Sequence, residues 1–257
     1  MKKLISLIMS VVMIFSLSNI ALANNNTFNN SSKKSDVLKL ENFSWNEYKE
    51  GLEKNPSVNV TTPKRTTLNK NTNSDTISLN VSNINTEITH TETSNEDILF
   101  FNETDTNKSD TISINKKTGI IKLDGEKVTI TKESVQENTK NISSTYSASS
   151  DSWEYMGSNN YTINLSRKIR DVTNTALATL MVAALELTGL LGVFVGFAAS
   201  ILVATPALFL DKDHIYLRDY CWLEADAIYP RLKQTVYAYY DPARTLCGGS
   251  TTNIIYS

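Results

Sequence analysis

The feature that most constrains this chain is a continuous apolar run from Thr175 to Leu210, which spans 36 residues and contains a single charge, Glu186. A helix needs about 20 apolar residues to cross a bilayer, so a run of this length must be buried inside the protein or placed in a membrane. Glycine weakens a helix in water and proline bends or ends one. Three glycines lie near the middle of the run and a proline near its end: Gly189, Gly192, Gly196 and Pro206. We therefore expect two helical limbs, a hairpin over residues 171–210.

Three interpretations of this hairpin are open. As a permanent anchor it would leave the basic group 167–170 outside the cell and the charged group 211–213 inside, against the positive-inside tendency. As the core of a soluble domain it would need cover on every side, which the C-terminal half supplies only in part. As a membrane-active segment it would be stored in a soluble form and later enter a bilayer. We favour the third interpretation, with the core as the alternative.

Small and polar residues inside the run fit the membrane-active interpretation. Gly192, Gly196 and Ser200 recur every four positions, a spacing that lets helices approach closely in lipid. Glu186 would be a polar group that has to be paired, neutralised or placed at a water-lined surface. The expected partner is the lipid membrane of a target cell, and the small-residue spacing is compatible with a homo-oligomer there.

The first 23 residues have the pattern of a secretory signal. Lys2 and Lys3 form a positive start, residues 4–17 are apolar, and Ala21-Leu22-Ala23 fits the cleavage pattern. We expect a secreted, extracellular protein, with an uncleaved anchor helix as the alternative. The formal net charge of −2 argues against nucleic acid as a partner.

Composition divides the remaining chain into four parts. Residues 24–70 are rich in Asn, Ser, Thr and Lys and are expected to be mostly disordered, apart from a short helix within 37–52. Residues 71–136 alternate in polarity and predict a small β-rich region, a possible pro-segment. Residues 137–150 are expected to form a linker. Residues 151–257 would form the C-terminal domain.

Short strands are expected on both sides of the apolar run. In the β-rich region they fall at 76–81, 98–101, 111–114, 120–123 and 128–130, with Asp124-Gly125 as a hairpin turn. After the run, aromatic segments between 214 and 257 predict further strands. The expected fold class is α+β: a polar β-rich N-terminal half, then an apolar helical hairpin packed with a small antiparallel sheet.

Cysteine usage and missing motifs limit the chemistry. Cys221 and Cys247 are the two cysteines, and in an exported chain they predict a disulfide, with free thiols as the alternative. Only His214 lies near them, so we expect no metal site. No nucleophile elbow, phosphate-binding loop or metalloprotease motif occurs. We therefore expect no cofactor and no enzymatic activity.

One segment and its surroundings give a resemblance. Ser152-Trp153-Glu154-Tyr155-Met156-Gly157-Ser158 follows a polar half and precedes the Gly-rich apolar run, and Tyr239-Tyr240-Asp241-Pro242 ends a Tyr-rich strand. This layout resembles secreted proteins of Gram-positive bacteria and is similar to large geobacillin-type bacteriocins. The resemblance covers roughly 152–257 and implies an antibacterial protein. The alternative is a secreted or cell-envelope binding or structural protein in which the hairpin is only core.

Overall fold

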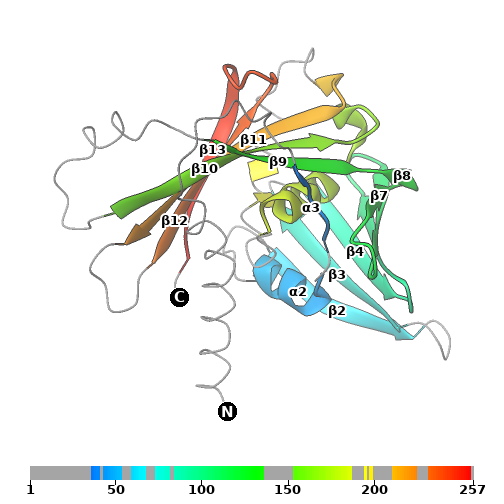
Figure 1. Ribbon diagram of the computed structural model, residues 1–257. Helices are drawn as coiled ribbons and strands as arrows, with labels where there is room; N and C mark the ends of the chain where they lie inside the picture. Colours follow the sequence, from blue (N-terminus) through cyan, green and yellow to red (C-terminus); the bar gives the residue numbers. More distant parts are fainter. Residues whose placement is uncertain are drawn as a thin grey trace.

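A computed structural model describes the chain in several stretches: residues 36–40, 43–53, 59–67, 73–81, 84–135, 153–186, 194–195, 197–198, 210–224 and 231–255. The predicted signal, residues 1–23, and the predicted linker, residues 137–150, lie outside them. Two antiparallel sheets make up most of the described chain (Figure 1).

The first sheet is a meander of seven strands in which each strand pairs with the next along the chain. The strands are β2 (Asn59–Thr67), β3 (Asn73–Val81), β4 (Ile84–Glu92), β5 (Glu96–Glu103), β6 (Lys108–Asn115), β7 (Ile121–Leu123) and β8 (Glu126–Lys127). Alternate residues point to one buried face, where Ile88, Leu99, Phe101 and Ile112 form part of the core. β2 is an edge strand, and Pro63 falls in its register shift, where a missing N–H is tolerated.

The second sheet has six strands in the order β1-β9-β10-β11-β12-β13. The strands are β1 (Asp36–Val37), β9 (Thr129–Val135), β10 (Trp153–Asn164), β11 (His214–Glu224), β12 (Leu232–Tyr239) and β13 (Cys247–Ile255). Only Val128 separates β8 from β9, so the chain passes directly from one sheet into the other. The second sheet therefore combines strands from both compositional halves of the sequence.

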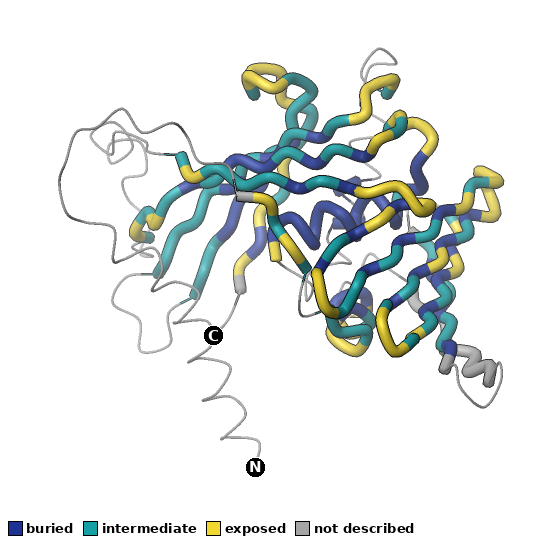
Figure 2. The backbone as a smooth tube through the Cα atoms, turned by 45° about the vertical axis from the view of Figure 1, so that its right-hand side comes forward, coloured by how far each residue is buried: buried dark blue, intermediate teal, exposed yellow. Residues whose placement is uncertain are grey.

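The structure describes three helices: α2 (Trp45–Glu53), the short 3-10 helix η2 (Ile169–Asp171) and α3 (Asn174–Leu185). Of these, α2 and α3 bury residues in the core that the sheets share. α3 contacts β6 in the first sheet and β9 and β10 in the second, and every residue from Thr175 to Leu185 is buried. Figure 2 shows α3 as a buried segment behind the strands. The two sheets thus enclose a helix that is apolar on all sides.

The expected fold class is wrong in its central element. The described residues form two antiparallel sheets with short helices and contain no C-terminal apolar helical hairpin. The first limb ends at Leu185, and of the second limb the structure describes only Phe194, Val195, Phe197, Ala198 and Leu210. The error has a physical cause. We expected cover for the run from the C-terminal half alone, whereas β6 of the polar half supplies it from the other side.

Candidate functional site

The apolar run is an excursion between two neighbouring strands. β10 and β11 are paired along their whole lengths, and Asn164 lies opposite His214. The chain between them carries η2, α3 and the rest of the run. We call residues 171–210 the apolar excursion. It lies between two strands that would otherwise be joined by a short hairpin turn.

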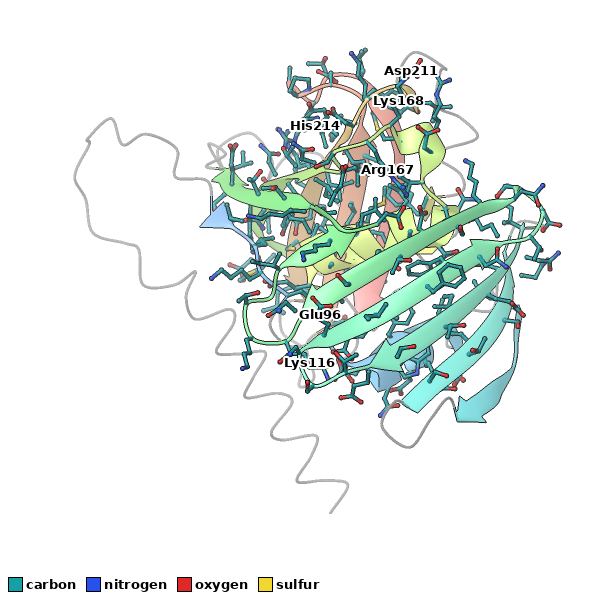
Figure 3. All side chains as sticks on the ribbon, turned by 90° about the vertical axis from the view of Figure 1, so that its right-hand side faces the viewer. Glu96, Lys116, Arg167, Lys168, Asp211 and His214 are labelled. Carbon is teal, nitrogen blue, oxygen red and sulfur yellow. The ribbon has the colours of Figure 1, made fainter. Side chains whose placement is uncertain are left out.

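The two ends of the excursion are tied together in a stem made of residues 165–170 and 211–213. The amide of Leu165 donates to the carbonyl of Asp213, and the amide of Ile169 to that of Lys212, each at 2.8 Å. Asp211 forms ion pairs with Lys168 and Arg170. Figure 3 labels Lys168 and Asp211, which lie together at this end of the molecule. The stem closes the excursion independently of the contacts that α3 makes between the sheets.

The N-terminus of α3 is held by two buried carboxylates, Glu103 at the end of β5 and Asp110 in β6. The amide of Thr173 donates to Asp110 Oδ2 and the amide of Asn174 to Glu103 Oε1, both at 2.6 Å. Thr173 Oγ1 also accepts a hydrogen bond from the amide of Ala176, which makes it the N-cap residue. Both carboxylates are only 1% exposed. We call Glu103 and Asp110 the carboxylate clamp. It satisfies free amides and places negative charge at the positive end of the helix dipole.

The two carboxylates of the clamp differ in the positive charge near them. Arg167 forms ion pairs with Asp110 and with Asp124. Glu103 forms no ion pair with an arginine among the described residues, and it accepts a hydrogen bond from Thr106 Oγ1 at 3.0 Å. Burial raises the pKa of Glu103 above its ordinary value, although the hydrogen bonds from Thr106 and Asn174 oppose the rise. The ionised form of Glu103 is therefore the costly form at this site.

Two hydroxyl contacts fix the sides of α3. Thr175 Oγ1 lies 3.4 Å from Thr86 Oγ1 on β4. Thr179 Oγ1 donates to the Thr175 carbonyl and lies 2.8 Å from Tyr48 Oη on α2. Because the Thr179 hydroxyl proton is already used, Tyr48 is the donor in that second bond. α3 is thus joined both to the first sheet and to α2.

The predicted site residues of the excursion fall into two groups. Glu186 is exposed and ends α3 in the left-handed conformation, with φ 56°. It lies at the exposed C-terminal end of α3, and the role expected for it in a membrane stays a prediction. Gly189, Gly192, Gly196, Ser200 and Pro206 lie outside the described residues. The 12 residues of α3 extend about 18 Å, and none of the helices that the structure describes is long and apolar enough to cross a bilayer.

The predicted disulfide is not formed, and both cysteines are free. The strand register explains why. Cys221 aligns through Gln234 with Asn253, whereas Cys247 aligns through Tyr239 with Tyr216. The two cysteines are therefore two strands and five residues apart, about 20 Å, whereas a disulfide needs Cα atoms within about 7 Å. Burial and the nearby Asp219 raise the pKa of Cys221 to about 12, which keeps this thiol protonated.

Sequence reasoning missed the clamp, although a signal for it exists. On β5, Glu103 continues the alternation of Leu99 and Phe101, and on β6, Asp110 begins the alternation of Ile112 and Ile114. A carboxylate in phase with apolar residues on a strand points into the core and needs a partner there. Comparisons of the chain with known protein families, curated proteins and solved structures find no match. Its function is therefore inferred from its own geometry.

Proposed function

We propose that this is a secreted, membrane-active protein of antibacterial type that stores the apolar excursion between its two sheets and releases it into a bilayer. The observation that carries the proposal is the closed stem. Because the excursion leaves and rejoins the second sheet at adjacent strand ends, it can swing out without breaking the pairing of β10 with β11. Release exposes a helix with no polar face, and such a helix is stable only in lipid or under cover.

The role of α3 in this proposal differs from that of a spanning helix. At about 18 Å, α3 alone is shorter than a hydrocarbon core of roughly 30 Å. The membrane segment we propose is the whole excursion, in which α3 is the first part. The clamp and the Tyr48–Thr179 bond hold this first part in the stored state, and loss of those contacts is the releasing step.

A second candidate function is supported by the burial of α3. α3 and residues of both sheets belong to one continuous core, as in a secreted binding or cell-envelope protein whose excursion never leaves. The two functions differ in what happens when α3 is locked in place. The locked protein should behave like the free one if the excursion is permanent core.

The test is a reversible lock at Thr86 and Thr175, whose hydroxyls already touch. Both are replaced by cysteine in a background that carries Cys221→Ala and Cys247→Ser. A matched control places the same lock at Thr76 and Thr89, a paired position within the first sheet whose hydroxyls lie 3.0 Å apart. Dye leakage from vesicles rich in phosphatidylglycerol is then measured before and after reduction.

The proposal expects the oxidised T86C/T175C protein to lose its leakage activity and to regain it after addition of dithiothreitol. The control lock should leak equally in both redox states. Leakage that is unaffected by the lock would overturn release of α3. No leakage from any variant, including the wild type, would establish the second candidate in its place.

A further inference from the structure

The outer face of the second sheet carries a row of side chains that the excursion does not involve. Tyr155 lies opposite Trp222, Trp222 opposite Lys233, and Lys233 opposite Ile254, so one row crosses β10, β11, β12 and β13. We call these residues the aromatic row. Residues that lie opposite each other on paired strands point to the same face of the sheet. Cys221, which precedes Trp222 in β11, points to the other face, the one that contacts the core. The row therefore faces away from α3.

Lys233 is held in the middle of this row between two indole rings. Its Nζ lies 4.8 Å from the ring centre of Trp153 and 4.9 Å from that of Trp222. Among the residues that the structure describes, no carboxylate forms an ion pair with Lys233. The nearby Glu224 is engaged by the guanidinium of Arg231 instead. The row thus presents a positive charge that is held between two rings and is not neutralised by a described carboxylate.

Apolar side chains protrude beside this charge. Ile254 is 43% exposed, and Met156, next to Tyr155 at the irregularity of β10, is 38% exposed. The Trp222 ring lies 6.0 Å from both Tyr155 and Tyr220, which extends the aromatic surface. A sugar ligand would use the rings but would gain little from exposed aliphatic groups. Rings, a cation and protruding aliphatic groups together match the layers of a bilayer surface.

The position of the row suits a docking surface. Tyr155 of the row lies near the start of β10 and Asn164 ends that strand at the stem, so about nine residue steps, roughly 30 Å, separate the row from the stem. In Figure 1, β10 runs from its free end on the left toward the region of α3. Contact through the row would therefore leave the stem unobstructed.

We propose that the aromatic row docks the protein on the surface of an anionic bilayer. Trp153 and Trp222 lie at the level of the headgroups, Lys233 binds a lipid phosphate, and Ile254 and Met156 enter the outer acyl region. Charge complementarity selects anionic over neutral lipid. The choice of a bilayer as partner rests on the proposed function, but docking and release use different residues and can be separated.

The test measures sedimentation of the full secreted protein with vesicles of phosphatidylglycerol and with vesicles of phosphatidylcholine. We expect binding to the anionic vesicles to weaken about ten-fold in K233Q and in I254S, because each removes one of the two contributions. The matched control is F100S. Phe100 is also 43% exposed, but it lies on the outer face of the first sheet, away from the row. F100S should bind like the wild type.

Two results would overturn docking through the row: unchanged binding of K233Q and I254S, or equal binding of the wild type to both lipids. The oxidised T86C/T175C protein separates the two proposals. If it binds anionic vesicles like the wild type and does not leak, both stand. If no form leaks but binding still depends on Lys233 and Ile254, the proposed release fails and the docking surface stands.

Discussion

The helices α2 and α3 are both bound to the first sheet by polar contacts. In α2 the helix supplies the hydrogen-bond donors from its side chains, whereas in α3 the sheet supplies carboxylates that bind the helix backbone. Trp45 Nε1 and Lys49 Nζ of α2 donate to Asp75 of β3 at 2.9 and 2.7 Å. The Trp45 ring also stacks on His90, with ring centres 4.8 Å apart. α3 has no charged side chain, and the sheet supplies Glu103 and Asp110 to its backbone amides.

This difference follows from the two sequences. α2 is amphipathic and buries Tyr48, Gly51 and Leu52, so its remaining side chains are free to make polar contacts. α3 is buried from Thr175 to Leu185, and apart from the hydroxyls of Thr175 and Thr179 its buried polar groups are the backbone groups at its two ends. A helix of this kind has few side chains that can form hydrogen bonds, so the backbone amides at its N-terminus become its main points of polar attachment. α3 is therefore held chiefly through the amides of Thr173 and Asn174, whereas α2 is held by its own side chains.

The largest effect should come from Asp110, the clamp residue that forms an ion pair with Arg167. Asp110→Asn removes the charge that pairs with Arg167 and faces the first amides of α3, and it should reduce the free energy of unfolding by about 3 kcal/mol. Asp124→Asn removes the other partner of Arg167 at a more exposed position, and its cost should stay below about 1 kcal/mol. Urea denaturation of both variants measures the difference. Equal losses would show that Arg167, and not the clamp, dominates.

The second prediction concerns pH, because acid should change the stability contributed by Asp75, at α2, and by Glu103, at α3, in opposite directions. Burial by itself would raise the pKa of Asp75, but the hydrogen bonds from Lys49 and Trp45 outweigh it and lower that pKa. The stability that Asp75 contributes is therefore present above its unfolded value and is lost as the pH falls through its lowered pKa. The pKa of Glu103 is raised by burial, so its ionisation destabilises the fold as the pH rises above the ordinary range of a glutamate.

Two variants separate these contributions. Asp75→Asn should cost about 1 kcal/mol at neutral pH, from a lost charge-assisted bond, and the deficit should shrink in acid. Glu103→Gln should be more stable than the wild type at neutral pH, and the gain should vanish in acid. Urea midpoints from neutral pH down to acid test both, with the exposed Glu87→Gln as control. A Glu103→Gln protein that is less stable at neutral pH would contradict the assigned direction of the pKa.

Local patterns in the sequence predicted the strands better than their assembly. The segments expected at 76–81, 98–101, 111–114 and 120–123 lie almost entirely in β3, β5, β6 and β7, and Asp124-Gly125 forms the turn between β7 and β8 with positive φ at both residues. Alternation is a local property of neighbouring residues, so it can be seen in one chain. β2, β4 and β10 were missed because Asn, Thr, Glu and Ser weaken the alternation there. β2 also lies in the segment 24–70 that composition predicted as mostly disordered.

The site depended on contacts that a single sequence does not reveal. Asp110 and Thr173 are 63 positions apart, and the strands that cover α3, β6, β9 and β10, come from separate parts of the chain. The small residues at 192, 196 and 200 pointed to a helix pair, whereas α3 ends before them, at Leu185. The number of cysteines predicted a disulfide, but a count says nothing about strand register. The register of β11, β12 and β13 places Cys221 and Cys247 far apart.

The smallest predicted effect lies at the other end of α3 and tests whether the helix is fastened only at its start. Glu186 has φ 56°, a conformation that costs most residues free energy and costs glycine almost none. Glu186→Gly should therefore stabilise the protein by about 0.5–1 kcal/mol. Glu186→Gln keeps the side-chain length and removes the charge, and it should leave the unfolding free energy unchanged because the residue is exposed. Thermal unfolding of the two variants distinguishes backbone strain from charge. A loss of stability in both would mean that the Glu186 carboxylate stabilises α3 as that of Asp110 does.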